Sequence, residues 1–436
     1  MKIAIIGGGF MGLVLAHEIT KTNAEVKVFE SGAQLGGLTT YHDYGSFVWD
    51  KFYHVITPTD SDLIEFIDEL GLGDKICWRR SLTGYYSKRK FYSLSSSKEF
   101  LMFPLLGIID KIRLGYTLFY GSKINDWKKL EKIPVKDWLI KLGGKRTYEK
   151  FWAPMLYAKL GENRKKVSAV FIWTYIKRLF KARSSAAQKE HMAYVTGGYK
   201  TVFDRIEASL TAAGSQVLKE SAIDEIVPDL SGGIRLTYNG KQEHFEKVVF
   251  TGPLNILEKV TSPDLFSISK SAQPIDYLGV ICLIVVTTKP ISPYYVLNIG
   301  DTDTPFTGVI GMSSVVDLDQ TAGKYITYFP KYISADHDYW SKTDEELKNI
   351  FLKGVSDLYP EFDMSNLEST HVNRAFKVQP MQVLNYSEII PKIHTKHPDF
   401  YVLNTSQFVN ESVNNNSVIG HVNRFMVDFK NDLKAL

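Results

Sequence analysis

The pattern of apolar and polar positions at the start of the chain is that of a strand, a helix and a second strand. Lys2 to Ile6 is an apolar run with the length of a buried strand, and Glu25 to Phe29 is a second one. Between them, residues 13–20 have helical character, and glycines separate the first strand from this helix. The pattern therefore predicts that the chain opens with one βαβ unit.

The rest of the chain predicts a mixture of helices and strands. Apolar spacing at residues 63–70 predicts a helix that ends at Gly71, and an aromatic-rich, largely helical stretch follows to about residue 190. A further helix is predicted from Asp344 to Leu358, where Thr343 supplies the cap, and a last helix is expected at the C-terminus. Apolar runs bounded by turn signals predict strands at 215–218, 234–238, 247–251, 277–287, 324–329 and 400–403.

The 436 residues, 44% hydrophobic and 23% charged, are enough for two domains with cores of their own. The two cysteines, Cys77 and Cys282, form no Cys-x-x-Cys pattern, which predicts neither disulfides nor a metal site. The apolar stretch 100–120 is interrupted by Pro104 and Asp110, so no transmembrane helix is expected. Since no export signal is visible either, we expect a cytoplasmic protein.

The formal charge of +4 is small, but basic residues cluster at 88–90 and at 176–183. Neither cluster alternates aromatic and basic residues as a nucleic-acid-binding module does, so DNA and RNA are not expected partners. Residues 176–183 alternate cations with bulky apolar residues, as an interfacial amphipathic helix does. Two interpretations stay open for this segment: a solvated helix face, or peripheral contact with the inner face of a membrane.

Residues 7–12 (GGGFMG) satisfy the pattern G-x-G-x-x-G between a strand and a helix. Gly7 permits a tight turn, Gly9 lets the backbone approach a pyrophosphate, and Gly12 lets helix and strand pack closely. The pyrophosphate is expected at the positive N-terminus of the helix. Glu30 ends the second strand, where an acid accepts hydrogen bonds from ribose hydroxyls and disfavours the 2′-phosphate of NADP. The motif predicts a dinucleotide site, with glycine-rich packing that holds no nucleotide as the alternative.

The run GGGFMGL…VFESGAQLGGLTT resembles the FAD fingerprint of the amine-oxidase and protoporphyrinogen-oxidase superfamily, which includes phytoene desaturases and has UDP-galactopyranose mutases as relatives. Residues 47–54 (FVWDKFYH) resemble the segment that these families place along the isoalloxazine, and residues 194–199 (YVTGGY) resemble their glycine turn into the FAD domain. The resemblance implies FAD as the cofactor. It implies contacts with FAD at Gly7, Gly9, Phe10, Met11, Gly12, Glu30, Ser31, Gly36, Gly37, Leu38, Thr39 and Ile223.

The chain departs from this superfamily near its C-terminus. Where the family presents a Gly-Asp pair beside the ribityl chain and the pyrophosphate, residues 403–408 are LNTSQF. Asn404 and Gln407 could donate hydrogen bonds to FAD in place of that pair. We therefore expect both residues in the cofactor site.

The resemblance also implies an α/β fold with two domains. A discontinuous, Rossmann-like FAD-binding domain is expected from residues 1–75, 196–265 and 391–436. A second, α+β substrate domain on a mixed sheet is expected from residues 76–195 and 266–390.

His54 and Arg374 are the candidate catalytic residues. His54 lies in the flavin-adjacent segment and could act as a general base or a proton donor near neutral pH. The alternative is a histidine that only packs under the ring or satisfies the backbone. Arg374 lies in a segment that, by resemblance, reaches the active site, where its guanidinium could hold a carboxylate or phosphate. A structural ion pair is the alternative for Arg374.

Three functions are compatible with these features. The leading hypothesis is an FAD-dependent oxidoreductase that removes a hydride from a C–N, C–C or C–O bond of a small molecule, with a phosphorylated or lipid-linked compound of polysaccharide or glycolipid assembly as one substrate class. The second is a non-redox sugar mutase resembling UDP-galactopyranose mutase. The third is a non-catalytic partner-binding protein on the same fold. The intact glycines and Glu30 favour an enzyme.

Overall fold

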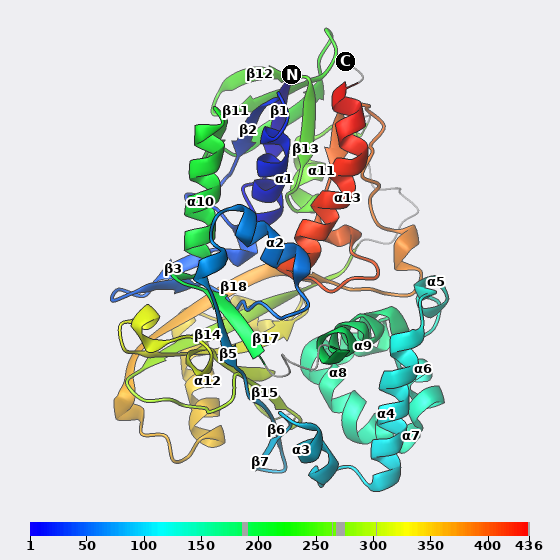
Figure 1. Ribbon diagram of the computed structural model, residues 1–436, viewed down its shortest axis with the longest axis vertical. Coiled ribbons are helices and arrows are strands. Elements are labelled where there is room, and N and C mark those ends of the chain that lie inside the picture. Colours follow the sequence, from blue (N-terminus) through cyan, green and yellow to red (C-terminus); the bar gives the residue numbers. More distant parts are fainter. Residues whose placement is uncertain (185–190, 264, 267–274, 302, 435–436) are drawn as a thin grey trace.

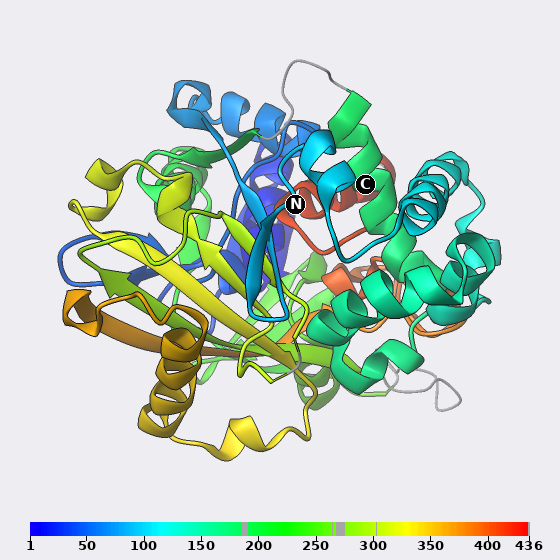
Figure 2. The ribbon, with the colours of Figure 1, turned by 90° about the horizontal axis from the view of Figure 1, so that it is seen from below.

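The computed structural model describes residues 1–184, 191–263, 265–266, 275–301 and 303–434, apart from the side chains of residues 97, 179–184 and 434. Both chain termini lie at one end of the molecule, beside β1 and α13 (Figure 1). The opposite end holds a mixed sheet and a group of helices, which lie side by side when the molecule is seen from below (Figure 2).

A parallel sheet of five strands forms the centre of the first domain. In spatial order its strands are β19 (Phe400–Val402), β13 (Lys247–Phe250), β1 (Lys2–Ile6), β2 (Glu25–Phe29) and β9 (Gln216–Leu218). The inner strands are mostly apolar because both faces of the sheet are buried, although β2 carries the buried Lys27. The three stretches that the sequence assigned to the FAD domain supply these five strands.

Helices and a small antiparallel sheet cover the two faces of the parallel sheet. One face packs against α1 (Phe10–Thr20), α2 (Ser61–Glu69), α10 (Gly198–Ala212) and α13 (Asn415–Lys434). The other packs against α11 (Leu254–Val260) and the sheet of β10 (Ile223–Pro228), β11 (Ile234–Tyr238) and β12 (Lys241–Phe245). This layering confirms the predicted α/β class with a Rossmann-like domain.

A mixed sheet of seven strands forms the second domain. In spatial order its strands are β18 (Leu367–Pro380), β14 (Tyr277–Thr287), β17 (Tyr325–Ile333), β16 (Gly308–Gly311), β15 (Val296–Ile299), β6 (Thr83–Ser87) and β7 (Lys90–Ser93). One face packs against α12 (Asp344–Leu358), which begins with the predicted Thr343 cap. The other face packs against residues of the predicted flavin-adjacent segment, such as Trp49 and Phe47.

The helical part of the second domain begins later than predicted. Its helices are α3 (Ser97–Met102), α4 (Ile108–Lys123), α5 (Trp127–Leu130), α6 (Val135–Gly143), α7 (Lys145–Thr147), α8 (Ala153–Leu160) and α9 (Ala169–Ser184). Residues 76–93, predicted as mainly helical, instead form β5 (Ile76–Arg80), β6 and β7. Strands β6 and β7 form a local hairpin, whereas β5 pairs with β8 (His191–Val195) and β6 also pairs with β15, each more than a hundred residues away.

In the part of the chain that the structure describes, no helix is both long enough and apolar enough to cross a membrane.

Candidate flavin site

The turn between β1 and α1 requires glycine at two positions. Gly7 has a φ of +116°, and a Cβ at Gly12 would lie 1.9 Å from the carbonyl oxygen of Gly7. Gly9 differs, because a Cβ there would meet nothing closer than the Cα of Gly37 at 3.9 Å. The protein's own packing therefore leaves room for a side chain at position 9. A pyrophosphate would fill this open space beside Gly9, which we call the cradle.

Helix α1 begins at this cradle. Gly9 is its N-cap, and its first turn contains no acidic side chain. The N–H groups of Phe10, Met11 and Gly12 have no carbonyl partner within the helix, because the first turn of any helix leaves its donors free. Together with the helix dipole, these donors favour a bound anion.

Glu30 connects the two loops that follow β1 and β2. Its Oε2 accepts the backbone N–H of Gly8 at 2.9 Å, and its Oε1 accepts that of Gly32 at 2.7 Å. The hydroxyl of Ser31 donates to Oε1 at 3.3 Å. Oε1 thus accepts from two donors, whereas Oε2 accepts from one and keeps a further lone pair with which Glu30 could accept from a ribose hydroxyl.

The second glycine pair lies against the first turn. The N–H of Gly36 donates to the Gly8 carbonyl at 2.9 Å, and both Gly36 and Gly37 have positive φ. A Cβ at Gly36 would lie 2.5 Å from the Phe203 ring. The residues that follow extend the site, because Leu38 is partly exposed and the Thr39 hydroxyl donates to Oδ1 of Asn415 at 3.0 Å.

Ile223, one of the FAD contacts that the resemblance implies, is buried at the start of β10. Two residues earlier, the N–H of Ser221 donates to the carbonyl oxygen of Glu30 at 2.8 Å. The backbone that leads into β10 is thus held beside the predicted ribose-binding acid, as an FAD contact at Ile223 requires.

The segment 47–54 lies between the two domains and contains a buried carboxyl group. Oδ1 of Asp50 accepts the backbone N–H of Tyr199 at 2.8 Å, and burial raises the pKa of Asp50 to about 8. The hydroxyls of Tyr44 and Tyr328 donate to its carbonyl oxygen at 3.1 and 2.6 Å. These contacts fix the segment against both the glycine turn before α10 and the mixed sheet.

His54 is a neutral, buried imidazole. Its Nδ1 lies 3.0 Å from the carbonyl oxygen of Phe52, which can only accept, so Nδ1 carries the proton. Its ring contacts Tyr199 edge to face, with 5.5 Å between centroids. Burial lowers the pKa of His54 to about 4. At neutral pH Nε2 can therefore accept a hydrogen bond, whereas the predicted role as a proton donor is not supported by this geometry.

Arg374 lies on the other side of the mixed sheet from the flavin-adjacent segment. It pairs across the sheet with Ile281, which packs in the core under α12. Its guanidinium forms an ion pair with Asp344 and donates to the carbonyl oxygen of Lys342 at 2.8 Å. The structure does not bring Arg374 to His54, and its contacts are those of the structural ion pair that the sequence left open.

The turn after β19 uses the side chain of Gln407 internally. Oε1 of Gln407 accepts the N–H of Asn404 at 3.0 Å, and its Nε2 donates to the carbonyl oxygens of Pro391 and Val402. Gln407 therefore shapes the turn, and its donors are not free for FAD as predicted. Asn404 donates to the Gly252 carbonyl at 3.1 Å, beside Thr251, whose hydroxyl contacts the carbonyl oxygen of Gly7 at 3.2 Å.

Sequence reasoning gave no role to Tyr199 or Asn415, which join the separate parts of the site. Tyr199 contacts His54 and also the ring of Phe10, at 6.1 Å between centroids. Asn415 is the first residue of α13 and accepts from Thr39. The glycine pair before Tyr199 indicated that this residue lies near the cofactor, but no feature of the local sequence indicated the same for Asn415.

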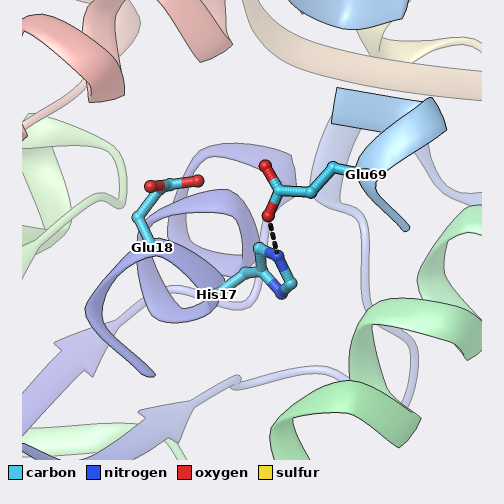
Figure 3. A group of neighbouring side chains, drawn as sticks. All are labelled: His17, Glu18 and Glu69. Atoms are coloured by element: carbon cyan, nitrogen blue, oxygen red, sulfur yellow. Dashed lines mark hydrogen bonds and ion pairs between the residues drawn. The ribbon is translucent and has the colours of Figure 1, made fainter. Parts of the chain in front are cut away.

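His17, Glu18 and Glu69 form an acidic group at the far end of α1 (Figure 3). Nε2 of His17 lies 2.8 Å from Oε1 of Glu69, and a carboxylate oxygen of Glu18 lies within 4.8 Å of both. The ammonium of Lys21 already forms ion pairs with Glu18 and Glu69, at 2.6 and 2.5 Å. Lys21 thus bridges the two carboxylates, so we infer a link between α1 and α2 and assign no metal to it.

The basic segment 176–183 makes contacts within the protein where its side chains are described. Arg178 forms an ion pair with Asp60 at 3.0 Å, and Lys177 donates to Oδ1 of Asn125 at 3.0 Å. The side chains of residues 179–183 lie outside the described part of the structure. The two cations of this segment whose side chains are described, Lys177 and Arg178, therefore make contacts within the protein and do not form a fully solvated helix face.

Residues 11–402 match the family model described as flavin containing amine oxidoreductase. Mitochondrial protoporphyrinogen oxidase of Nicotiana tabacum is 31% identical over 74 residues, which are 17% of this chain and 15% of that protein. The protein assigned as flavin-containing monoamine oxidase AofH in Mycobacterium tuberculosis is 23% identical over 241 residues, 52% of this chain and 51% of that protein. The chain thus aligns with only part of each relative's length.

A solved structure extends the likeness to the whole fold. The crystal structure of a protein from Exiguobacterium sp. 255-15, assigned as a protoporphyrinogen oxidase, superposes with a TM-score of 0.78 at 14% identity and covers 99% of both chains. The family model spans most of the chain, and the cradle at Gly9 with Glu30 fits a dinucleotide. The chain therefore belongs to the flavin-containing amine oxidoreductase family, and FAD is its cofactor.

Proposed function

We propose that this flavin oxidoreductase removes a hydride from a C–N, C–C or C–O bond of a small molecule that enters between α4, α9 and the start of α13. The observation that carries the proposal is a cavity of about 530 Å³ at this place. Its walls include Trp173 and Thr174 of α9 and Asn414 and Asn416 at the start of α13. Asn415, between the last two, accepts a hydrogen bond from Thr39 in the FAD fingerprint.

Bound FAD would supply the two-electron acceptor for the hydride. The protein's own groups position and enclose the reacting bond. His54 can accept a hydrogen bond at Nε2, and Asp50 holds the backbone of Tyr199, whose ring packs on His54. Since burial favours the neutral forms of both His54 and Asp50 at pH 7, this part of the site suits a reaction that transfers a hydride and does not need a strong base.

The cavity also supports the narrower proposal of an anionic substrate, such as a phosphorylated or lipid-linked compound of polysaccharide or glycolipid assembly. Lys123, Lys177 and Arg178 line it, against the two acids Asp60 and Glu411. Lys177 donates to the Ser122 carbonyl and to Asn125, which leaves one of its three ammonium protons for a ligand. A lysine is well suited to hold a phosphate as a point charge.

Anaerobic mixing with candidate substrates tests the proposal. Purified yellow protein is mixed with amines, polyprenyl phosphates and nucleotide sugars, and loss of the visible absorbance of oxidised FAD is followed. A phosphorylated substrate should bleach the flavin, and Lys177→Gln should raise its half-saturating concentration about tenfold, because one charged contact is worth about 1.5 kcal/mol or more. Lys128→Gln, which removes an exposed lysine of α5 that does not line the cavity, is the matched control.

Other results would reject parts of the proposal. Bleaching by amines without a phosphate group alone, with no effect of Lys177→Gln, would leave the oxidase and remove the anionic substrate. Conversion of a nucleotide sugar by pre-reduced protein with no net electron transfer would replace the oxidase with the mutase hypothesis.

A further inference from the structure

Helix α4 exposes most of its large apolar side chains to solvent and buries two polar ones. Its buried positions are Asp110, Leu114, Thr117 and Gly121. Asp110 accepts the Gly107 N–H at 3.2 Å and pairs with Nε of Arg146 at 3.2 Å. The exposed positions include Ile108 and Ile112, at 71% and 67% of full exposure. A surface helix that only packs on a core in water would expose polar side chains on the outer face, where α4 has these isoleucines.

Most of the exposed apolar side chains of this region lie along α4, and two more lie at the end of α3, where the Leu101 carbonyl accepts from Lys111 of α4. Among the described residues, 15 large apolar side chains are exposed, and eight of them lie between residues 101 and 120. At about 100° per residue, the six on α4 fall within an arc of about 120° and extend along about 18 Å of helix. We call these eight residues the α4 stripe: Leu101, Met102, Ile108, Ile109, Ile112, Tyr116, Phe119 and Tyr120.

The stripe has the composition of a surface that enters a lipid interface. Isoleucines occupy its first part, and the stacked rings of Tyr116 and Tyr120 occupy the second, where hydroxyls can reach water while the rings remain in an apolar layer. Cations border it, because Arg113 is exposed at one edge and Lys123 ends the helix with its ammonium over the Phe119 ring. The one acid of α4, Asp110, is buried on the opposite face.

The charge of the surrounding helices is strongly one-sided. Residues 97–184, from α3 to α9, contain 20 Lys and Arg and 7 Asp and Glu, a formal charge of +13, although the whole chain carries only +4. The rest of the chain is therefore acidic, at −9. An anionic lipid surface complements both features at once, because its acyl region accepts the apolar stripe and its headgroups attract the surrounding cations. A typical protein partner would complement only one of the two.

We propose that the α4 stripe docks this protein onto an anionic membrane surface, with α4 lying in the plane of the interface. Helix α4 lies in the half of the molecule opposite the two chain termini (Figure 1). Ser122 and Lys123, at the end of α4, line the 530 Å³ cavity. Docking in this orientation places an opening of the cavity close to the lipid headgroups. The inference does not depend on which substrate is oxidised, because lipid binding can be measured without turnover.

Co-sedimentation with vesicles tests the proposal on the FAD-loaded protein. Vesicles of phosphatidylcholine are compared with vesicles of equal parts phosphatidylcholine and phosphatidylglycerol, at low and at high salt. We expect binding to the anionic vesicles that weakens with salt. The triple variant Ile108→Ser, Ile112→Ser, Phe119→Ser should lower the partition coefficient at least about tenfold, because it removes three apolar side chains from the lipid contact.

A second triple variant controls for the loss of exposed apolar area in general. Leu230→Ser, Ile256→Ser, Val427→Ser removes three exposed apolar side chains from the FAD domain and should bind vesicles as the wild type does. The visible flavin spectrum and the thermal midpoint of each variant show that it is folded and loaded. Neither measurement depends on the lipid contact.

Several outcomes would overturn the proposal. Wild-type protein that does not sediment with anionic vesicles would do so, as would equal binding by the wild type and the stripe variant. Binding to phosphatidylcholine alone that is insensitive to salt would reject the anionic surface. A wild type that forms a dimer in solution, with a monomeric stripe variant and no vesicle binding, would assign the stripe to a second copy of this chain.

Discussion

The backbone N–H of Tyr199 donates to Oδ1 of Asp50 at 2.8 Å, between residues 149 positions apart in the sequence. Asp50 ends β4 (Val48–Asp50), in the segment predicted beside the flavin, and Tyr199 follows the glycine turn that opens α10. A Cβ at Gly198 would lie 2.9 Å from the same oxygen. Two stretches that the sequence associated with the flavin separately are thus one structural unit.

Asp50→Asn should remove a pH dependence of stability. Burial raises the pKa of Asp50 from 3.8 to about 8, so the folded protein keeps a proton that the unfolded chain releases. The free energy of unfolding should therefore fall as pH rises from about 4 to about 8, by up to about 1.4 kcal/mol per pH unit, and level off above that. The amide of Asp50→Asn still accepts from Tyr199 but does not titrate, so urea unfolding of this variant should show a smaller slope.

The control for this experiment is Asp74→Asn, which removes one exposed carboxylate and should leave the slope of the wild type in place. Equal slopes for Asp50→Asn and the wild type would show that the Asp50 carboxyl does not hold its proton in the folded protein.

Gly9→Asp should give folded protein without FAD. A Cβ at Gly9 has no neighbour closer than 3.9 Å, so the substitution does not disturb the protein's own packing. The new carboxylate would point into the cradle at the start of α1 and repel the pyrophosphate, at a cost of about 3 kcal/mol or more, which lowers FAD affinity more than about a hundredfold. The absorbance ratio of flavin to protein measures the loss.

Gln242→Glu adds the same charge on an exposed strand of the small antiparallel sheet and should leave the protein yellow. A yellow Gly9→Asp protein would mean that the cofactor does not approach the backbone at Gly9. A comparison of the two variants as apoproteins, by thermal unfolding, separates loss of FAD from loss of fold.

Arg374→Gln should lower stability and leave flavin and substrate binding unchanged. The Arg374 guanidinium pairs with Asp344 in the first turn of α12, and the pair is partly exposed, so we expect a loss of about 1 kcal/mol or less. Asp344→Asn should cost a similar amount, and the double variant should cost less than the sum because the interaction is shared. A rise in KM for Arg374→Gln at unchanged stability would restore the catalytic role that the sequence suggested.

The cofactor site was predictable from the sequence because its parts are local. Gly7, Gly9 and Gly12 and the helix they precede are adjacent in the chain, and their chemistry is that of the backbone. Glu30 follows at a spacing that a βαβ unit fixes. No long-range contact had to be known to place a pyrophosphate at the start of α1.

Long-range packing decided what the remaining side chains do. The period of two along β18 shows that alternate residues share a face, but not which face meets the flavin segment and which meets α12, and Arg374 lies on the second. Gln407 and Asn404 were chosen for their polarity, yet the donors of Gln407 bond to backbone carbonyls brought close by the fold of the turn. Hydrogen-bonding capacity is a property of a residue, whereas its partner depends on the tertiary structure.

Helix α4 shows the same division between sequence and structure. Its residues, Asp110 and Thr117 on one side and isoleucines on the other, define two faces of a helix with a period of 3.6. Sequence alone would place the isoleucines inside. The partner Arg146 and the contacts with α6, α7 and α9 bury the face that carries Asp110, Leu114 and Thr117 and leave the isoleucines in solvent. The sequence by itself determined the helix and its two faces, and only the packing of its neighbours decided which of them the protein exposes.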